Sequence, residues 1–551
     1  MVPEVDSSSN HPPAKADYLL QLSRRHTGLT CLLAGILPIM VRLMLLPFLP
    51  PPVPAVQDEF SYLLGADTFA AGRLTNPPHP MWVHFETFHV NQQPTYGSKY
   101  PPAQALFLAF GQKLFGKPWF GVVLSVGLMC AAFCWMLEGW IEPVYAALIT
   151  LLVIATWGIT GDWMNSYWGG AAAAIGGALV IGCIPRLARQ VRIVHVILSA
   201  VGIVILANSR PFEGLLTVTS CAGVLLWLTR REHRRWRTLI QPRVVTALLL
   251  VMLPAAAAMG YYNYRNTGNA LLLPYILNER SYAASPRFYL SGPIPSPVYR
   301  HEAIRQLWQD WDRSIYLAAH ANPLAPIAFS LPFVAPFYFL NCFGFLALIG
   351  LLAGRRSVVI PAVALLAVPV GGVLLEKAFL AHYLAPVCGA WLILSAAGLE
   401  SVLQWRLGTF RAGPLIGVIM CGLAFGNCAS EAAAAAREAR QPKGISTRPL
   451  LIDRLQRGGG RHLILVRYTS RPYSLVSVKL FNFTVVNKIV ASSRPEWVYN
   501  GADIDSAPVV WARDMGTAKN RELLEYYSDR KVWLLEPDVN PLKLDPITSG
   551  L

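Results

Sequence analysis

The sequence predicts an α-helical polytopic membrane protein with a small α/β domain at its C-terminal end. Of its 551 residues, 54% are hydrophobic and only 14% are charged, and the mean hydropathy is +0.41. An ordinary soluble protein carries about 25% charged residues. About 11 apolar stretches precede residue 430, each near the length of about 20 residues that a spanning helix needs. The residues from 429 onward have the composition of a soluble domain.

The predicted spans follow the apolar runs in order. The first run is longer than a usual signal-peptide core and has no clear cleavage site, so we interpret it as an uncleaved first span. The spans are expected at 29–49, 119–138, 143–160, 169–185, 194–208, 214–229, 244–260, 326–353, 358–375, 386–402 and 413–428.

Arginines set the expected orientation. They gather in short connections between apolar runs, such as 230–237, 186–192, 355–356 and 406–411. Such clusters are typical of cytoplasmic loops. We therefore expect a multi-pass protein of the cytoplasmic membrane with a cytoplasmic N-terminal segment at 1–27. The same pattern argues against nucleic-acid binding, although the formal net charge is +16.

This orientation divides the chain into three parts. After the N-terminal segment comes a transmembrane domain at 28–428, with large outer loops at 50–118 and 261–325. An α/β domain at 429–551 is expected outside the membrane. It begins with a helix at 431–440 and has strand-like runs at 462–468, 508–512 and 531–535, with a helical pattern at 520–527.

Two adjacent carboxylates follow the first span. Asp58 and Glu59 stand at the start of a helix-like stretch in the first outer loop. Neighbouring helical positions point about 100° apart, so we expect the two side chains to have different roles. An acidic pair also caps a helix N-terminus, and the sequence leaves this alternative open.

The same outer loop continues with a short motif and an amphipathic run. Residues 97–102 read Gly-Ser-Lys-Tyr-Pro-Pro, and an apolar stretch then ends in Leu-Phe-Gly at 114–116. The stretch is too short and interrupted to span. It is expected to lie along the membrane interface and roof a site.

Together, the Asp-Glu pair, the lysine, the two prolines and the Leu-Phe-Gly ending resemble the GT-C superfamily of polyprenyl-phosphate-sugar-dependent glycosyltransferases. Protein O-mannosyltransferases and the aminoarabinose transferases that modify lipid A belong to it. The motif covers about residues 50–120, and the multispan plan extends the likeness to the whole chain. In the family the lysine commonly abuts the prolines, whereas Tyr100 intervenes here, so Lys99 matches less closely than Asp58.

The resemblance implies an inverting transfer on the outer face, from a polyprenyl-phosphate-linked sugar to an acceptor hydroxyl. Asp58 would be the general base, with Glu59 beside it. The leaving phosphate is a stable anion, which needs cations more than a proton donor. The residues expected to bind substrate or the donor phosphate are Lys99, Tyr100, Arg210, Glu213, Lys377, His382 and Tyr383.

The expected roles of Arg210 and Glu213 have a simple alternative. These residues are three positions apart and could merely pair with each other at a span end. Asp162 lies where the family often has a second outer-loop carboxylate, and it is carried over as a further acid.

A divalent cation, Mg²⁺ or Mn²⁺, could bind through Asp58, Glu59 and the donor phosphate. His79, His84 and His89, with Glu86, have a five-residue spacing that matches no ligand pattern.

The acceptor stays open among a glycan, a lipid and a protein, and the aromatic residues of the loop 261–325 could anchor the membrane or stack on sugar. The alternative function is a polytopic transporter or lipid flippase. Transporters usually place ionisable residues at the bilayer midplane, often with repeat symmetry, whereas the charges here crowd one face.

Overall fold

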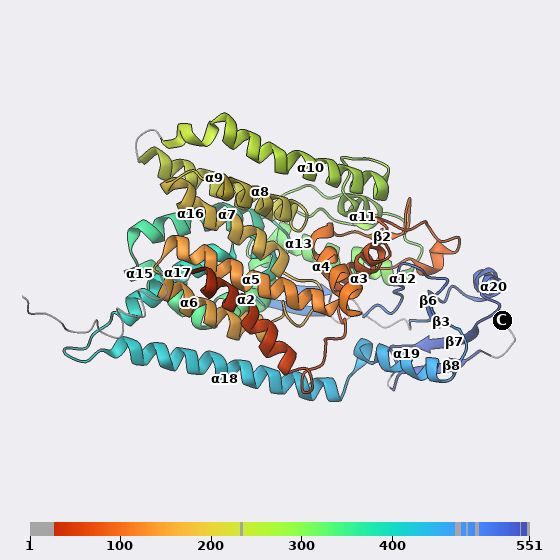
Figure 1. The fold of residues 1–551 in the computed structure, drawn as a ribbon. Coiled ribbons are helices and arrows are strands. Elements are labelled where there is room, and N and C mark those ends of the chain that lie inside the picture. Colours follow the sequence, from red (N-terminus) through yellow and green to blue (C-terminus); the bar gives the residue numbers. More distant parts are fainter. Residues whose placement is uncertain are drawn as a thin grey trace, which may run out of the picture.

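The computed structural model describes residues 27–231, 235–468, 475–480, 483–490, 495–539 and 541–547. Long helices run side by side through most of the molecule, and a small sheet lies at one end of this bundle (Figure 1). The predicted fold class, a polytopic helical protein with a C-terminal α/β part, is confirmed.

Within these ranges, seven helices are long and apolar enough to cross a membrane, or eight if a bent pair forms one span. The seven are α2 (Thr27–Met44), α5 (Trp119–Trp140), α7 (Ala171–Arg189), α9 (Pro211–Arg231), α10 (Pro242–Thr267), α16 (Arg356–Val373) and α18 (Ala412–Arg440). Shorter apolar helices complete the bundle: α6 (Pro143–Val153), with the π-helical turn η2 (Ile154–Ile159), α8 (Ile193–Ala207), α14 (Ala325–Tyr338), α15 (Cys342–Ala353) and α17 (Cys388–Leu403).

Two predicted boundaries are wrong. The span expected at 326–353 is two helices, α14 and α15. Asn341 starts the second helix, because its side chain accepts hydrogen bonds from the backbone N–H groups of Phe343 and Gly344. At the other end of α14, the stretch Glu302–Ala321 meets it at a bend of 117°. The helix expected at 431–440 is not separate but continues α18, since the Ala-rich stretch holds no helix breaker.

The outward faces of several helices are strongly apolar. Leu250 and Leu253 of α10 are 71% and 61% exposed, and Val418 and Leu423 of α18 are 70% and 69% exposed. Soluble proteins rarely expose contiguous apolar surface of this kind, whereas lipid-facing helices require it. These faces therefore support the membrane assignment.

The first outer loop folds into short elements beside the bundle. They are α3 (Gln57–Ala70), the 3₁₀ turn η1 (Trp82–Phe85), the paired strands β1 (Val90–Asn91) and β2 (Gly97–Ser98), and α4 (Pro102–Phe115). The loop 261–325 adds α11 (Pro274–Tyr282), α12 (Glu302–Arg305), the π-helical turn η4 (Gln306–Asp312) and α13 (Arg313–Ala321). Short 3₁₀ segments are η3 (Arg235–Ile240), η5 (Ala381–Leu384) and η6 (Gly444–Thr447).

The C-terminal part is built on a four-stranded sheet in the order β6-β3-β7-β8. β3 (His462–Val466) pairs in parallel with β6 (Val509–Arg513) and β7 (Lys531–Glu536), and β8 (Lys543–Pro546) is antiparallel to β7. The helices α19 (Arg448–Arg457) and α20 (Thr517–Tyr526) flank it. A hairpin of β4 (Leu475–Leu480) and β5 (Phe483–Val490), which was not predicted, reaches α13 and α14 instead.

The sheet and the first outer loop share one hydrophobic core. Phe60 and Leu64 of α3, with Phe85, are buried together with Trp511 and Val498 of the C-terminal part. The rings of Phe60 and Tyr499 stack with centroids 4.3 Å apart. Figure 1 shows α3, β2 and α12 at the same end of the bundle as this sheet. The helix that carries Asp58 is thus packed against the C-terminal part.

Candidate active site

Asp58 and Glu59, at the start of α3, make different hydrogen bonds. The Glu59 carboxylate accepts hydrogen bonds from the backbone N–H groups of Ala55 and Val56, 2.8 and 3.0 Å away, and from that of Tyr167 at 2.9 Å. It therefore caps the helix and ties it to the loop before α7. Burial raises the pKa of Glu59, although the three N–H groups oppose this. Asp58 takes no part in this capping and accepts a hydrogen bond from the hydroxyl of Tyr100.

Local contacts fix Tyr100 in this position. It follows β2, and its backbone N–H donates to the hydroxyl of Ser98, which lies 2.8 Å from the hydroxyl of Ser61 on α3. Its ring stacks on Tyr62 with centroids 4.3 Å apart. The next residues, Pro101 and Pro102, begin α4. The β1–β2 turn is thereby held against α3, and it brings the phenol to the carboxylate.

Lys99 stands beside the same carboxylate among aromatic rings. Its Nζ lies 5.1, 4.9 and 5.7 Å from the ring centroids of Tyr100, Tyr275 and Trp308. Such rings attract a cation through their negative faces. Burial lowers the pKa of Lys99 to about 8, although Asp58 and other carboxylates favour the charged form. The amine is therefore charged at neutral pH.

The electrostatics around Asp58 keep it ionised. Burial by itself would raise the pKa of Asp58, but His89, Lys99, the Tyr100 hydrogen bond and His382 together lower it below its ordinary value. Burial lowers the pKa of His89 to about 3 and that of His382 well below its ordinary value. Both imidazoles are thus neutral at neutral pH, and Lys99 supplies the positive charge beside Asp58 there.

A second charged group lies across from this pair. Arg210 lies just before α9. Its guanidinium is 4.6 Å from the ring centroid of Tyr383, and its nearest nitrogen is 3.7 Å from Oε1 of Glu213, which is a long distance for an ion pair. Glu213 is paired more tightly with Arg287, at 3.1 Å, and Arg287 also holds Glu376 at 3.0 Å. Local pairing of Arg210 with Glu213 is therefore only part of the arrangement. Burial raises the pKa of Glu376 to about 7 despite this pairing.

The two groups belong to one site. Tyr62, which stacks on Tyr100, interacts electrostatically with Arg210, Asp58 and Tyr383. His382, on η5, interacts with Asp58 and Arg210, and its ring packs on Trp168 with centroids 4.9 Å apart. Of the predicted residues, the structure therefore brings together Asp58, Lys99, Tyr100, Arg210, Glu213, His382 and Tyr383.

Two other predicted residues have partners of their own. Lys377 donates to the Asp312 carboxylate and the Ser285 hydroxyl, at 2.7 and 2.8 Å, so it anchors the loop that carries them, and its charge also acts on Lys99. Asp162 lies beside Glu431 of α18, and burial together with that carboxylate raises the pKa of Asp162. No contact between Asp162 and the group around Asp58 is seen in the described ranges.

Glu59 is poorly placed to bind a divalent cation, whereas Asp58 keeps one oxygen, Oδ2, without a hydrogen bond among the described residues. The Glu59 oxygens already accept three backbone N–H groups, and Asp58 faces Lys99. A Mg²⁺ or Mn²⁺ site is built from free oxygen ligands, which Glu59 does not offer. In the described part of the chain, the one cluster of three metal-ligand side chains is formed by α2 and α5.

The histidines at 79, 84 and 89 are dispersed. His79 is 3.0 Å from Asp505, and His84 is 3.2 Å from the backbone oxygen of Arg513, so both tie the outer loop to the C-terminal part. His89 packs instead beside Tyr100 and Trp308. Its backbone has a φ of 61°, in the left-handed region. No sequence pattern marks a non-glycine residue that adopts this conformation.

Sequence reasoning missed five further residues near the site: Tyr62, His89, Tyr275, Arg287 and Glu376. Arg287 lies in a 65-residue outer segment without a motif around it. One signal was present, since Glu376 is next to Lys377 in a short apolar-flanked turn where a charged residue is costly.

No family model matches the sequence, and no curated sequence is significantly similar to it. Among solved structures, the chain is similar to ArnT from Cupriavidus metallidurans bound to undecaprenyl phosphate, with 13% identity, a TM-score of 0.48, and coverage of 79% of this chain and 82% of that one. For ArnT in the apo state the identity is 13%, the TM-score 0.46, and the coverage 95% and 93%.

An oligosaccharyltransferase from Archaeoglobus fulgidus, in complex with Zn and sulfate, is similar at 11% identity and a TM-score of 0.41, over 73% of this chain and 53% of that one. Because these TM-scores are below 0.5 and the identities are 13% or less, the likeness by itself assigns no activity to this chain.

Proposed function

We propose that this chain is a membrane glycosyltransferase that moves a sugar from a polyprenyl-phosphate donor to an acceptor hydroxyl on the outer face of the cytoplasmic membrane. Asp58 is the general base. The observation that carries the proposal is the pairing of a half-buried, ionised carboxylate with a hydrogen-bonded tyrosine and a caged lysine, beside a second basic centre.

The state of Asp58 suits the removal of a hydroxyl proton. Its carboxylate is ionised at neutral pH because its pKa lies below the ordinary value. Oδ1 of Asp58 accepts the hydrogen bond from the Tyr100 hydroxyl, and no hydrogen bond to Oδ2 of Asp58 is seen among the described residues. Oδ2 is the oxygen that accepts the proton from the acceptor as the bond to the anomeric carbon forms. A displacement of this kind inverts the configuration.

The cations suit a phosphate leaving group. As the bond from the sugar to the phosphate breaks, negative charge grows on the phosphate oxygens. Lys99 interacts electrostatically with Asp58, and Arg210 does so with Tyr62, while Arg287 is paired with Glu213 in the same region. Arg210 is only loosely paired, at 3.7 Å from Glu213, and is therefore the guanidinium most easily redirected to a phosphate.

The donor class rests on the resemblance of the first outer loop to polyprenyl-phosphate-sugar-dependent enzymes, and the acceptor is a hydroxyl on a glycan, a lipid or a protein. In this proposal the part from residue 429 onward supports α3 from outside the membrane, as its shared core with Phe60 and Leu64 suggests. The N-terminal segment is cytoplasmic.

Complementation of a strain that lacks this protein tests the proposal. Mass spectrometry of its envelope glycolipids and glycoproteins should reveal the loss of one sugar, which wild type restores and Asp58→Asn does not. Asp453→Asn is the control, because the Asp453 side chain is exposed on α19 and pairs with the neighbouring Arg457. Both variants should reach wild-type levels in the membrane.

A measurement of donor-lipid binding distinguishes the proposed role of Asp58 as the base from a role in donor binding. Purified Asp58→Asn should still bind undecaprenyl phosphate, because the cations remain. Restoration of the sugar by Asp58→Asn would remove Asp58 from the role of base, and an unchanged envelope in the deletion strain would overturn the proposed function.

A further inference from the structure

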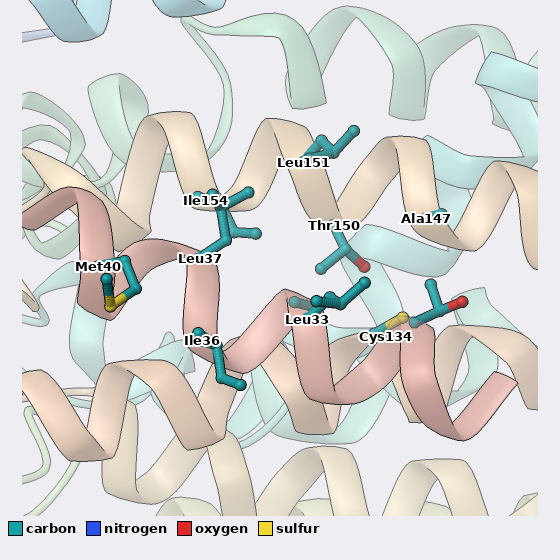
Figure 2. Close-up of a pocket in the computed structure, with 11 residues that line it drawn as sticks. Leu33, Ile36, Leu37, Met40, Cys134, Ala147, Thr150, Leu151 and Ile154 are labelled. Carbon is teal, nitrogen blue, oxygen red and sulfur yellow. The ribbon is translucent and has the colours of Figure 1, made fainter. Parts of the chain in front are cut away.

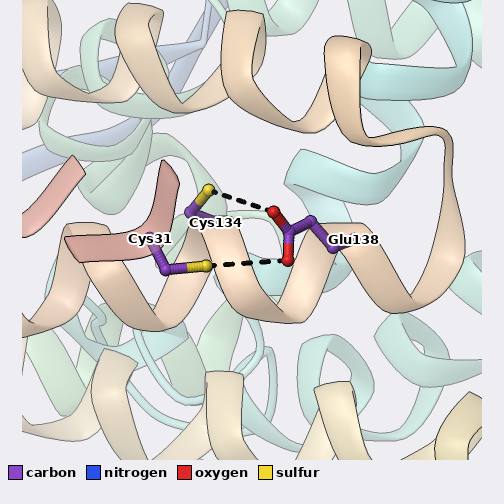
Figure 3. Close-up of side chains that lie close together, drawn as sticks. All are labelled: Cys31, Cys134 and Glu138. Atoms are coloured by element: carbon purple, nitrogen blue, oxygen red, sulfur yellow. Dashed lines mark hydrogen bonds between the residues drawn. The ribbon is translucent and has the colours of Figure 1, made fainter. Parts of the chain in front are cut away.

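Outside the candidate active site, two cysteines and a glutamate converge between α2 and α5. Cys31 is in the second turn of α2, and Cys134 and Glu138 are on one face of α5, four residues apart. Figure 3 shows both sulfur atoms turned toward the carboxylate. The Sγ of Cys31 is 3.6 Å from Oε2 of Glu138, and the Sγ of Cys134 is 3.9 Å from Oε1. All three ligand atoms lie within 4.8 Å of one another.

The separations between sulfur and oxygen are close to those of two ligands on one zinc ion. Zinc binds sulfur at about 2.3 Å and carboxylate oxygen at about 2.0 to 2.2 Å, so two ligand atoms on one ion are about 3.5 to 3.8 Å apart. The distances of 3.6 Å from Cys31 to Oε2 and 3.9 Å from Cys134 to Oε1 are close to that range, although they join the two sulfurs to different oxygens of Glu138. A thiol is a weak hydrogen-bond donor, so two thiol bonds compensate poorly for the burial of a carboxylate.

The charge around the cluster also favours a divalent cation. Two thiolates and a carboxylate carry three negative charges, and a divalent ion cancels two of them. Arg186 of α7 interacts electrostatically with Glu138 and supplies the remaining charge. Its guanidinium is fixed by the backbone oxygens of Gly182 and Trp135, at 2.7 and 2.6 Å. The loaded cluster would be neutral, as a site inside an apolar bundle requires.

There is space beside the cluster for a fourth ligand. Cys134 lines a cavity of about 450 Å³ between α2 and α6, with Leu33, Leu37 and Leu151 on its walls (Figure 2). Cys31 is partly exposed and lies near the N-terminal end of α2. Zinc held by three protein ligands takes a water molecule or another small ligand in the fourth position.

We propose that Cys31, Cys134 and Glu138 form a zinc site that fastens α2 to α5. Thiolate ligands select zinc over magnesium, calcium and manganese, and the carboxylate argues against copper(I). The site is independent of the proposed transferase chemistry, since it involves none of the residues around Asp58.

The test is the metal content of the full-length protein, purified in detergent without chelator and measured by mass spectrometry of the metals. Wild type should hold about one zinc ion per chain. Cys31→Ala, Cys134→Ala and Glu138→Gln should each lower the zinc content about tenfold or more, since loss of even a supporting partner of a ligand weakens metal binding by about 10- to 100-fold. Cys130→Ala is the matched control, because Cys130 is a buried cysteine one turn earlier on α5 that is not in the cluster. It should keep its zinc.

Cobalt(II) provides a second readout. In the wild type and in Cys130→Ala it should give the near-ultraviolet absorption of a cobalt–thiolate bond, and Cys134→Ala should lack it. Equal zinc in wild type and Cys134→Ala would overturn the proposal. So would a count of free thiols showing that Cys31 and Cys134 form a disulfide in the protein as isolated.

Discussion

The hydroxyl of Tyr100 donates a hydrogen bond to the carboxylate of Asp58. Tyr100 is also the residue that separates Lys99 from the two prolines at the start of α4, where the resembling family commonly has lysine next to proline. The extra position therefore has a structural role here. It lets two adjacent residues present a cation and a phenol to the same carboxylate.

Replacement of Tyr100 by phenylalanine should change the pH dependence of sugar transfer. The hydrogen bond lowers the pKa of Asp58, so its loss raises that pKa, and the ionised base is then lost at a higher pH. A hydrogen bond to a charged group contributes about 1.5 to 3 kcal/mol, so the acidic limb of kcat/KM should move up by about one to two pH units. Tyr264→Phe, on the exposed side of α10, should leave the profile unchanged. A lower plateau without movement of the limb would contradict this prediction.

Lys99 should make donor binding weaken in alkaline solution. Its pKa is lowered to about 8, so the free protein loses this charge as the pH rises through that value, while a bound phosphate favours the charged form. The affinity for undecaprenyl phosphate should therefore fall by up to about tenfold per pH unit above about pH 8.

Lys99→Arg should remove this pH dependence, because a guanidinium stays charged throughout. Its overall affinity should be lower, since the aromatic cage is shaped for an amine. Binding measured from about pH 7 to about pH 9.5 compares the two proteins, with the exposed Lys113→Arg as control. The same slope in Lys99→Arg and wild type would exclude Lys99 from the donor site.

Glu59 should prove to be a structural residue. Glu59→Ala leaves the backbone N–H groups of Ala55, Val56 and Tyr167 without their acceptor, which costs about 1 to 3 kcal/mol and should lower the Tm by several degrees. Glu59→Gln keeps an acceptor oxygen and should recover part of the loss. Thermal unfolding and turnover are measured on the same samples. If both variants kept the wild-type Tm but lost turnover, Glu59 would be a catalytic or metal-binding residue instead.

The contact between Phe60 and Tyr499 should couple the C-terminal part to activity. The stacked rings contribute about 0.5 to 1.5 kcal/mol beyond their buried area, and Phe60 is two residues from Asp58. Phe60→Leu and Tyr499→Leu should each lower the Tm and kcat, and the double variant should lose less than the sum. Leu450→Ala, an exposed position on α19, is the control. Strict additivity in the double variant would show that the stack does not transmit the effect.

The sequence predicted most of the local structure because helices and strands follow from short patterns. Runs of apolar residues located the bundle helices, and β3, β6 and β7 begin within one residue of the expected strands. The sequence also indicated that Asp58 and Glu59 differ in role, and the two carboxylates do have different hydrogen-bond partners, because adjacent helix positions diverge by about 100°. The capping alternative applies to Glu59 alone.

The break at Asn341 was missed because hydropathy does not register a side chain that caps a new helix. The unbroken α18 was missed because a change in composition was taken for a change in structure.

By itself, the sequence determined that the chain is a helical membrane protein and which outer residues are chemically notable, because hydropathy and charge are properties of short segments. Only the tertiary structure decided that Arg287 holds Glu213 and Glu376, that His89 joins Lys99 beside Asp58, and that Lys377 is paired with Asp312. These pairs join residues far apart in the chain, and their meeting depends on how whole helices pack, which no local pattern encodes.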